Sequence, residues 1–327
     1  MTQLRILAAA TTFATAFTLQ SATADEWTGY TYSAVSTTAA VKGMNRIVER
    51  AKDETDGELA IDLHLGKTLQ IASSDITQAV GDNIVQFAAD LFFAGNVPVG
   101  RVLSLPLLIE NDEEWDKAYA AMKPFLEEGF SGQGVAHLGG YRYPVQTIFA
   151  TFEIDSLDDL KGRKIRIVSP EQGAFVEEFG GSPITLSGSE VPTALERGVI
   201  DGVLTASAGG AKNWHEFLPY NYRFPVGYVG SQMIANADAY GALDEETQKT
   251  FANIVAEEGP KITAEFIEDE EVQKKSQADG GMTITEASAE DVAAATEKFS
   301  PFWEKWAEEA GPDHVEALKA VRAALGK

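Results

Sequence analysis

The chain has 327 residues, with 50 acidic and 26 basic side chains, and a formal net charge of −24 at pH 7. This charge excludes a nucleic-acid binder, because the phosphates would be repelled, but it does not define the charge of a buried ligand. Cysteine is absent and the four histidines show no ligand spacing, so we predict no metal site and no other cofactor.

The first 24 residues have the pattern of a secretory signal peptide. Arg5 supplies a positive start, residues 6–19 are apolar, and Ala-Thr-Ala at 22–24 is a cleavage signal. We predict cleavage after residue 24, export to the periplasm and a mature charge of −25, because Arg5 is the only charged residue before Asp25. A retained signal anchor is the alternative, although the segment is too short and too rich in threonine to span a bilayer.

Strand and helix patterns alternate through the first half of the mature chain. The hydrophobic periodicity predicts strands over 27–36, 59–65 and 84–91 and helices over 38–52, 73–80 and 111–129. This order is typical of a parallel, doubly wound sheet.

The second half predicts further strands and a long helix. The expected strands cover 134–139, 145–152, 164–168, 199–205, 228–235 and 282–284. The expected helices cover 155–160, 170–180, 189–197, 238–275 with a break near Gly259-Pro260, and two more at the C-terminus. No linker separates two domains, so we expect an α/β protein of two lobes, with the chain crossing between them more than once and a cleft between them.

Arg166 is the first candidate binding residue. It lies near the end of the strand over 164–168, just before the helix start at Ser169-Pro170. Ligands of open α/β sheets bind at the carboxyl ends of the strands, and a buried arginine is costly unless it is paired. A bidentate clamp on a ligand carboxylate fits the guanidinium. A salt bridge to a core acid and a solvated sheet edge are the alternatives.

Arg142 is the second candidate, since it follows a Gly-Gly pair and stands between two tyrosines at an expected lobe junction. An ordinary surface arginine is the alternative. Aromatic side chains near strand ends are candidates for the cleft lining, although each could equally be core: Phe92, Phe93, Tyr141 and Trp214.

Catalytic templates do not match the chain. A G-x-S-x-G elbow, an H-E-x-x-H pair and a P-loop are all missing from the sequence, and the Gly-Gln-Gly run at 132–134 lacks the third glycine of a dinucleotide fingerprint. Adjacent carboxylates at 158–159 and 177–178 are expected by chance in so acidic a chain.

Residues 156–205 resemble the core of the TRAP (tripartite ATP-independent periplasmic) transporter solute-binding proteins of the DctP type. The resemblance rests on Leu-x-Asp-Leu-Lys-Gly-x-Lys-Ile-Arg at 157–166, Gly-Ser-Pro at 181–183, Ser-Glu-Val at 189–191 and Ala-Leu-Glu-Arg-Gly-Val-Ile-Asp-Gly at 194–202. The order of elements over the mature chain is also similar.

The resemblance implies a type II periplasmic-binding-protein-like fold, in which two lobes close on a ligand and a long helix crosses both. It implies that lobe I comprises 25–139 and 231–271, and lobe II 140–230 and 272–327. Arg166 would be the family's carboxylate-binding arginine, and Arg142 a second ligand-binding arginine.

Two positions depart from the family pattern. Thr205 stands where many members have a ligand-contacting asparagine, and Gly188 stands where some sialic-acid binders have a phenylalanine. These departures disfavour sialic acid and point to a differently shaped, roomier and more apolar site.

The leading interpretation is a non-enzymatic periplasmic protein that binds a small organic carboxylate and delivers it to the TRAP membrane subunits. A receptor for a membrane sensor and a carboxylate-processing enzyme are the alternatives. The residues leave open a monocarboxylate with an apolar body, a 2-oxo or hydroxy acid, and a short dicarboxylate.

Overall fold

The computed structural model describes residues 25–327, in which the strands form two mixed sheets. The predicted signal peptide lies outside the described residues. Sheet A has the order β2, β1, β3, β10, β4, with bounds Leu59–His64, Asp25–Thr31, Phe87–Asp90, Gly230–Asn236 and Val135–Arg142. Sheet B has the order β11, β9, β5, β8, β6, β7, with bounds Thr283–Glu286, Tyr220–Gly227, Gln146–Ala150, Gly202–Thr205, Lys164–Ile167 and Ser182–Thr185.

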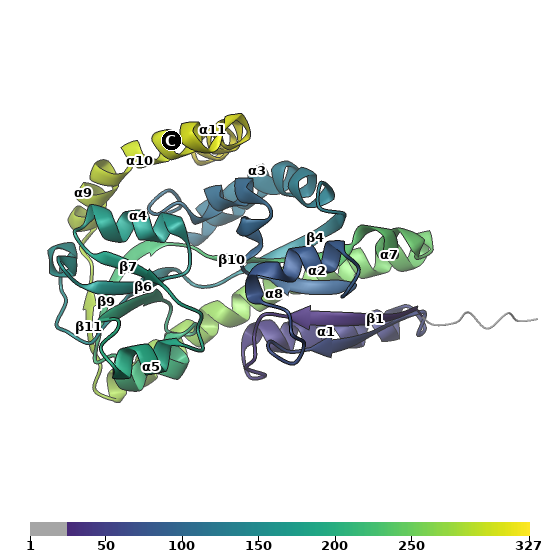
Figure 1. Ribbon diagram of the computed structural model, residues 1–327, viewed down its shortest axis with the longest axis horizontal. Helices are drawn as coiled ribbons and strands as arrows, with labels where there is room; N and C mark the ends of the chain where they lie inside the picture. The colour runs from purple at the N-terminus through teal and green to yellow at the C-terminus, as the bar shows by residue number, and fades with distance from the viewer. Residues whose placement is uncertain (1–24) are drawn as a thin grey trace, which may run out of the picture.

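Helices cover both faces of both sheets (Figure 1). The α-helices are α1 Ala39–Glu54, α2 Ile76–Gly81, α3 Asp112–Ser131, α4 Pro170–Glu178, α5 Val191–Glu196, α6 Ala211–Trp214, α7 Ala237–Ala242, α8 Glu245–Asp279, α9 Ala289–Phe299, α10 Pro301–Ala310 and α11 Pro312–Leu325. Short 3-10 helices are η1 Ser73–Asp75, η2 Phe93–Gly95, η3 Pro98–Ser104, η4 Leu157–Leu160 and η5 His215–Phe217. In the described part of the chain, none of the helices has the length and apolar character needed to cross a membrane.

The helix starts follow their capping residues. The hydroxyl of Ser169 accepts a hydrogen bond from the Gln172 amide at 3.3 Å, and Pro170 is the first residue of α4, as the sequence predicts. Asp244 caps α8 in the same way, with its carboxylate accepting from the amides of Glu246 and Thr247.

The core has three parts. A continuous cluster joins the two lobes on the side of α3 and α4, and it includes Phe130, Phe175 and Trp303. A second cluster lies between sheet A and the helices α1 and α8, and a third lies between sheet B and α5 and α6. Buried apolar surface is the main stabilising contribution, and here it holds both sheets and the segments between them in one body.

Strands β1, β2 and β3 pair in parallel, as the first half of the chain predicts, and β10 enters between β3 and β4 and runs antiparallel to both. Two other expectations about the fold are wrong. The long helix α8 does not break at Gly259-Pro260: a Cβ at Gly259 would lie 2.4 Å from the Gly140 oxygen, so this glycine permits close helix-to-strand contact. The C-terminal region forms the helices α9, α10 and α11 rather than two helices, and strands β7 and β9 were not predicted.

Within residues 25–327 the chain crosses between the sheets at three places: from β4 to β5, from β9 to β10, and along α8. The first two crossings touch, because the Tyr143 amide donates to the Val229 oxygen at 2.9 Å. Helix α11 then returns from the side of sheet B to pack on α3. The lobe boundaries given above stay a prediction. If the two lobes move relative to each other, they move about these crossings.

Candidate ligand-binding site

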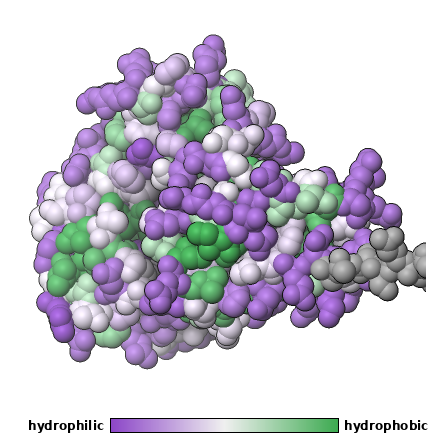
Figure 2. All heavy atoms as spheres, turned by 45° about the vertical axis from the view of Figure 1, so that its right-hand side comes forward, coloured by the Kyte–Doolittle hydropathy of each residue, from purple (hydrophilic) through white to green (hydrophobic). Residues whose placement is uncertain are grey.

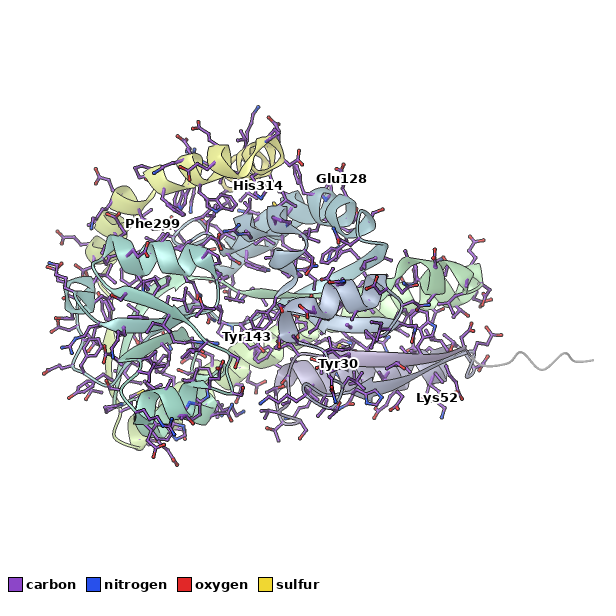
Figure 3. The ribbon with its side chains drawn as sticks, in the orientation of Figure 1. Tyr30, Lys52, Glu128, Tyr143, Phe299 and His314 are labelled. Carbon is purple, nitrogen blue, oxygen red and sulfur yellow. The ribbon has the colours of Figure 1, made fainter. Side chains whose placement is uncertain are left out.

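The carboxyl ends of strands from both sheets bound a common cleft. Strands β1, β3 and β4 run in one direction in sheet A, as do β6 and β8 in sheet B. A cavity of about 270 Å³ lies where the ends of β3 and β6 meet, lined by Phe92 and Phe93 from one side and Val168 and Ser169 from the other. Figure 3 shows Tyr143, which follows β4, in the region between the two sheets. This is the position at which open α/β sheets bind ligands.

Arg166 is a buried cation near the carboxyl end of β6. Its residue is 5% exposed, its Nε donates to the Leu186 oxygen at 3.0 Å, and its guanidinium lies 5.4 Å from the centroid of the Trp214 ring. Among the described residues no carboxylate lies within ion-pair distance of it, so the alternative of a core salt bridge is not found. Burial lowers the pKa of Arg166 to about 10, which still leaves the guanidinium charged at pH 7.

Trp214 forms the aromatic wall beside Arg166. A Cβ at Gly188 would lie 3.4 Å from the ring of Trp214, and a Cβ at Gly210 would lie 2.1 Å from it. The aromatic surface next to Gly188 therefore comes from Trp214 on α6. Thr205 supports this wall, because its hydroxyl accepts from the Gly210 amide at 2.9 Å and holds the loop that leads into α6.

Helix α8 fixes the same loop from behind. The carboxylate of Glu270 accepts from the Ala208 amide at 2.7 Å and pairs with Arg223 of β9 at 2.7 Å. Arg223 also donates to the hydroxyl of Ser207 at 3.2 Å. No local sequence pattern points to Glu270, because it is one carboxylate among many on an acidic helix.

Arg142 already has a protein partner. Its Nη2 lies 2.8 Å from Oδ1 of Asp112 at the start of α3, and the hydroxyl of Tyr228 donates to the same oxygen at 3.0 Å. Its guanidinium also lies 5.0 Å from the centroid of the Tyr228 ring, and the residue is 3% exposed. The contact between Arg142 and a ligand stays a prediction, and the charge of Arg142 is balanced by Asp112.

Three tyrosine hydroxyls meet at the carboxyl edge of sheet A. The hydroxyl oxygen of Tyr32 lies 2.6 Å from that of Tyr143 and 3.2 Å from that of Tyr141. We call Tyr32, Tyr141 and Tyr143 the tyrosine cluster. Burial raises the pKa of Tyr141 to about 12 and those of Tyr32 and Tyr143 well above their ordinary value, so all three are neutral at pH 7.

Phe92 lies beside the tyrosine cluster, with its ring edge-on to that of Tyr32 at 6.2 Å. The buried carboxylate of Asp90 accepts from the Phe92 amide at 2.7 Å and so fixes the chain after β3. Phe93 is 5% exposed and contacts Phe130 in the core, although it also borders the cavity. Of the predicted site residues, Phe92 and Phe93 line the cavity, whereas Tyr141, Arg166, Thr205 and Trp214 are not among its lining residues, and their contact with a ligand stays a prediction.

An ion pair forms part of the cavity lining. Nε of Arg101 on η3 donates to the buried carboxylate of Glu171 on α4 at 2.7 Å, and Nε1 of Trp306 on α10 donates to the same oxygen at 3.2 Å. Within residues 25–327 no group of three or more histidines and carboxylates could hold a metal ion.

The chain is similar to known solute-binding proteins. The model of bacterial extracellular solute-binding proteins, family 7, matches residues 30–309. The ectoine-binding periplasmic protein TeaA of Halomonas elongata is 26% identical over 268 residues, which are 77% of each chain. The C4-dicarboxylate-binding periplasmic protein DctP of Rhodobacter capsulatus is 24% identical over 289 residues, which are 86% of each chain.

A solved structure extends the match to three dimensions. DctP6, a Bordetella pertussis extracytoplasmic solute receptor binding pyroglutamic acid, is 27% identical, with a TM-score of 0.84 over 91% of this chain and 100% of that chain. The predicted α/β architecture with a long helix across two lobes is confirmed by this likeness. The chain belongs to the DctP family of bacterial extracellular solute-binding proteins, the non-enzymatic receptors of TRAP transporters.

Proposed function

We propose that this protein is a periplasmic receptor that captures a small organic carboxylate with Arg166, closes its lobes around it and delivers it to the TRAP membrane subunits. The predicted signal peptide and the periplasmic location of the relatives TeaA and DctP support the compartment. Membership of the family supports the membrane partners.

One observation carries the proposal: a charged guanidinium is buried at the ligand edge of β6 without a carboxylate from residues 25–327 to balance it. Burial of an uncompensated charge costs several kcal/mol unless a partner arrives. A ligand carboxylate supplies that partner. The stacking of Trp214 and the hydrogen bond to Leu186 hold the guanidinium fork in place, so little side-chain entropy is lost on binding.

The ligands of relatives support an organic acid. TeaA is named for ectoine, the Rhodobacter DctP for C4-dicarboxylates, and DctP6 was solved with pyroglutamic acid. Each of these compounds carries at least one carboxylate, which is the group that a bidentate arginine contact recognises.

The first prediction concerns Arg166 and uses calorimetry. Pyroglutamate and other organic acids that raise the melting temperature of the mature protein are titrated into the wild type, Arg166→Gln and Arg166→Lys. We expect Arg166→Gln to weaken binding about 100-fold or more, which corresponds to roughly 3 kcal/mol, because the carboxylate would be buried without a partner. Arg166→Lys keeps the charge without the fork and should bind with an intermediate affinity.

Arg163→Gln is the matched control, because Arg163 precedes the same strand but lies on the exposed surface over Phe152. It should bind as the wild type does. Affinity of Arg166→Gln within a few-fold of the wild type would refute the clamp. Transport is tested separately: removing the protein from its host should abolish uptake of the cognate acid.

A further inference from the structure

The crossing from β4 to β5 and the crossing from β9 to β10 meet at Arg142. Arg142 is the last residue of β4, and it is paired in sheet A with Gly230, the first residue of β10. Next to this pair, the Tyr143 amide donates to the Val229 oxygen at 2.9 Å. The segment that leaves sheet A and the segment that returns to it are therefore hydrogen-bonded to each other beside Arg142.

Arg142 contacts each of the three crossings described above. Its Nη1 donates to the Tyr143 oxygen at 3.4 Å in the first crossing, and its Cζ lies 5.0 Å from the ring centroid of Tyr228 in the second. Its backbone amide donates to Oγ1 of Thr263 at 3.2 Å, on the helix α8 that forms the third. One residue thus holds together the segments that join the two sheets.

The start of α3 completes this arrangement. Oδ1 of Asp112 lies 2.8 Å from Nη2 of Arg142 and accepts from the hydroxyl of Tyr228 at 3.0 Å. The ring of Trp115 on the same helix lies 5.7 Å from that of Tyr228, and a Cβ at Gly230 would lie 2.9 Å from Trp115. Because α3 also packs on β4, these contacts tie both crossings to sheet A. We call Asp112, Arg142 and Tyr228 the crossing junction.

The same contacts leave Arg142 little freedom to bind a ligand. The residue is 3% exposed, and Asp112 balances its charge. The cavity between the sheets is lined by Val229 and Gly230 of the second crossing, whereas Arg142 is not among the lining residues. A ligand carboxylate would have to compete with Asp112 for the guanidinium. Arg142 therefore acts on the cavity through the crossings that it holds.

We propose that Arg142 is a positioning residue for lobe closure rather than a ligand contact. Its guanidinium, fixed by Asp112, keeps the two strand crossings in one arrangement. Hinge motions concentrate their backbone changes in a few residues at the ends of elements, and the crossing junction lies at such a place. Its contacts therefore limit how freely the lobes open. The inference rests on the proposed function in one respect, because it assumes that capture of a ligand involves lobe closure.

Asp112→Asn is the main test variant, because the side chain of Asp112 is 55% exposed and its replacement leaves the core intact. The chain lacks cysteine, so Lys52→Cys on α1 and Glu196→Cys on α5 give one exposed spin-label site beside each sheet. In the ligand-free protein we expect Asp112→Asn to broaden the distribution of label-to-label distances by more than about 2 Å, because the crossings are held less firmly.

Binding gives a second readout, which has opposite signs for the two roles of Arg142. Pyroglutamate and succinate are titrated as probes with one and two carboxylates. We expect Asp112→Asn to weaken each acid that binds the wild type by about threefold to tenfold, because less of the protein is ready to close. Nε of Arg142 is buried without a partner among residues 25–327. If a ligand carboxylate bound this guanidinium, removal of the competing Asp112 carboxylate would tighten binding instead.

Glu113→Gln is the matched control. It removes a carboxylate from the same helical turn, but Glu113 pairs with Lys117 on the exposed surface. It should keep the label distances and the affinity of the wild type. Asp112→Glu keeps the charge and should restore most of the wild-type distribution. Tyr228→Phe removes one hydrogen bond to Asp112 and keeps the ring beside Arg142, so it should broaden the distribution less than Asp112→Asn. Melting temperatures check that the variants are folded.

The outcomes separate this inference from the proposed function. Wild-type label distances in Asp112→Asn, or tighter binding by this variant, would overturn the role of Arg142 in lobe closure and leave the clamp at Arg166 intact. Failure of every acid to bind the wild type would overturn the proposed function. The label distances of the ligand-free protein would still decide the role of Arg142, because they require no ligand.

Discussion

Gly210 leaves room for the Trp214 ring beside Arg166. Gly210 has ordinary right-handed helical dihedral angles, so its small size, rather than any unusual backbone, is what its position requires. A Cβ there would lie 2.1 Å from Cζ3 of Trp214, well inside van der Waals contact. At Gly188 the corresponding distance is 3.4 Å, which is an ordinary contact.

A prediction for the two glycines follows from this difference in distance. Gly210→Ala should force the Trp214 ring away from the guanidinium, weaken binding of the cognate acid about tenfold and change the tryptophan fluorescence. The Cβ of Gly188→Ala would lie at an ordinary contact distance from the same ring, so this variant should bind within about twofold of the wild type. Calorimetry of the two variants measures the difference. Equal affinity in both variants would mean that the position of Trp214 does not control binding by Arg166.

The site is only partly predictable at the scale of single residues. Arg166 is visible because a charged residue interrupts a buried strand just before a helix start, which is a local pattern. Tyr32 is not visible, because its partners are 109 and 111 positions away in the sequence. Asp112 is hidden for the same reason: its pattern indicates a helix N-terminus, and nothing in the sequence brings it to Arg142.

At the scale of elements, α8 is the support for both lobes. Its 35 residues give a length of about 52 Å. Towards its middle it packs on α1, where a Cβ at Gly43 would lie 2.1 Å from Ile262. Farther along, Glu270 holds the loop beside Trp214. A rigid α8 therefore joins the packing of sheet A to the geometry of the site.

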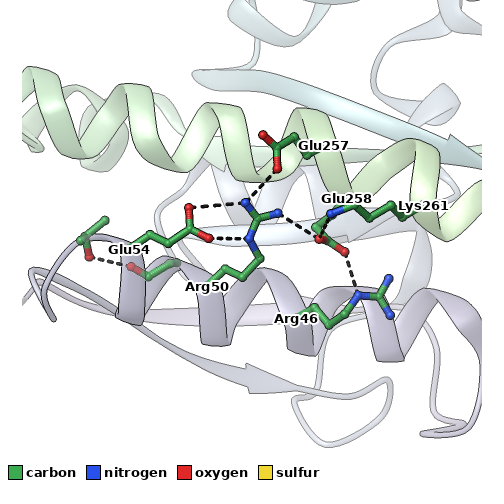
Figure 4. Close-up of polar contacts among 8 residues, drawn as sticks. Arg46, Arg50, Glu54, Glu257, Glu258 and Lys261 are labelled. Atoms are coloured by element: carbon green, nitrogen blue, oxygen red, sulfur yellow. Dashed lines mark hydrogen bonds and ion pairs between the residues drawn. The ribbon is translucent and has the colours of Figure 1, made fainter.

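The contact between α1 and α8 contains a buried carboxylate, Glu258, which is 1% exposed (Figure 4). Arg46 donates to it at 2.8 Å, Lys261 at 2.9 Å and Arg50 at 3.0 Å. Burial alone would raise the pKa of Glu258, but the hydrogen bonds from the three cations outweigh it and lower the pKa from 4.5 to about 2. Because the folded-state pKa is the lower one, this stabilisation is present above pH 4.5 and is lost as the pH falls towards 2.

A substitution of Glu258 tests its contacts with the three cations. Glu258→Gln should lower the free energy of unfolding at pH 7 by about 3 kcal/mol, and the difference from the wild type should shrink as the pH falls from 4.5 to 3. Glu257→Gln is the control, since Glu257 pairs with Arg50 but its side chain is 58% exposed, and such pairs contribute little. Urea unfolding at several pH values measures both. A pH-independent loss in Glu258→Gln would show that charge is not the cause.

The elements themselves follow from the sequence where the signals are local. The cap of α4 and the first helices were predicted because apolar periodicity and capping residues coincide there. The prediction of a break in α8 was wrong. A glycine beside a proline usually marks a helix end, whereas Gly259 lies inside the helix and allows it to approach β4 closely. The insertion of β10 between β3 and β4 pairs strands that are far apart in the sequence, so no local pattern predicts it.

At the scale of the whole molecule, the lobes are joined on two opposite sides. Helix α8 joins them on one side, and α9, α10 and α11 pass over the other (Figure 1). Lys298 donates to the Glu178 oxygen, and Trp303 donates to the Pro106 oxygen, so this C-terminal segment contacts both halves of the chain. The face in Figure 2 has many hydrophilic side chains, in keeping with the net charge of −24, and it also shows hydrophobic patches near its centre and at its left.

The ion pair of Arg101 and Glu171 lies beneath this segment, and Trp306 donates to the same carboxylate. Glu171 is 1% exposed, so its charge is compensated by Arg101 and not by water. Arg101 belongs to η3, which follows sheet A, and Glu171 belongs to α4, which follows β6. Because Arg101 and Glu171 both line the cavity and come from segments that follow different sheets, the strength of their ion pair depends on the separation of those segments.

We therefore predict that Glu171→Gln shifts the ligand-free protein towards an open form. The radius of gyration from solution scattering should rise by on the order of 1 Å above the roughly 19 Å of a compact chain of this length, and acid affinity should fall about tenfold, because less of the protein is ready to close. Glu178→Gln on the same helix is the control, since its exposed pair with Lys298 does not cross the cavity. If Glu171→Gln keeps the wild-type scattering and affinity, closure depends on α8 and the strand crossings alone. If instead both change together, and the effects of Arg101→Gln and Glu171→Gln are non-additive, the ion pair is part of the closing mechanism.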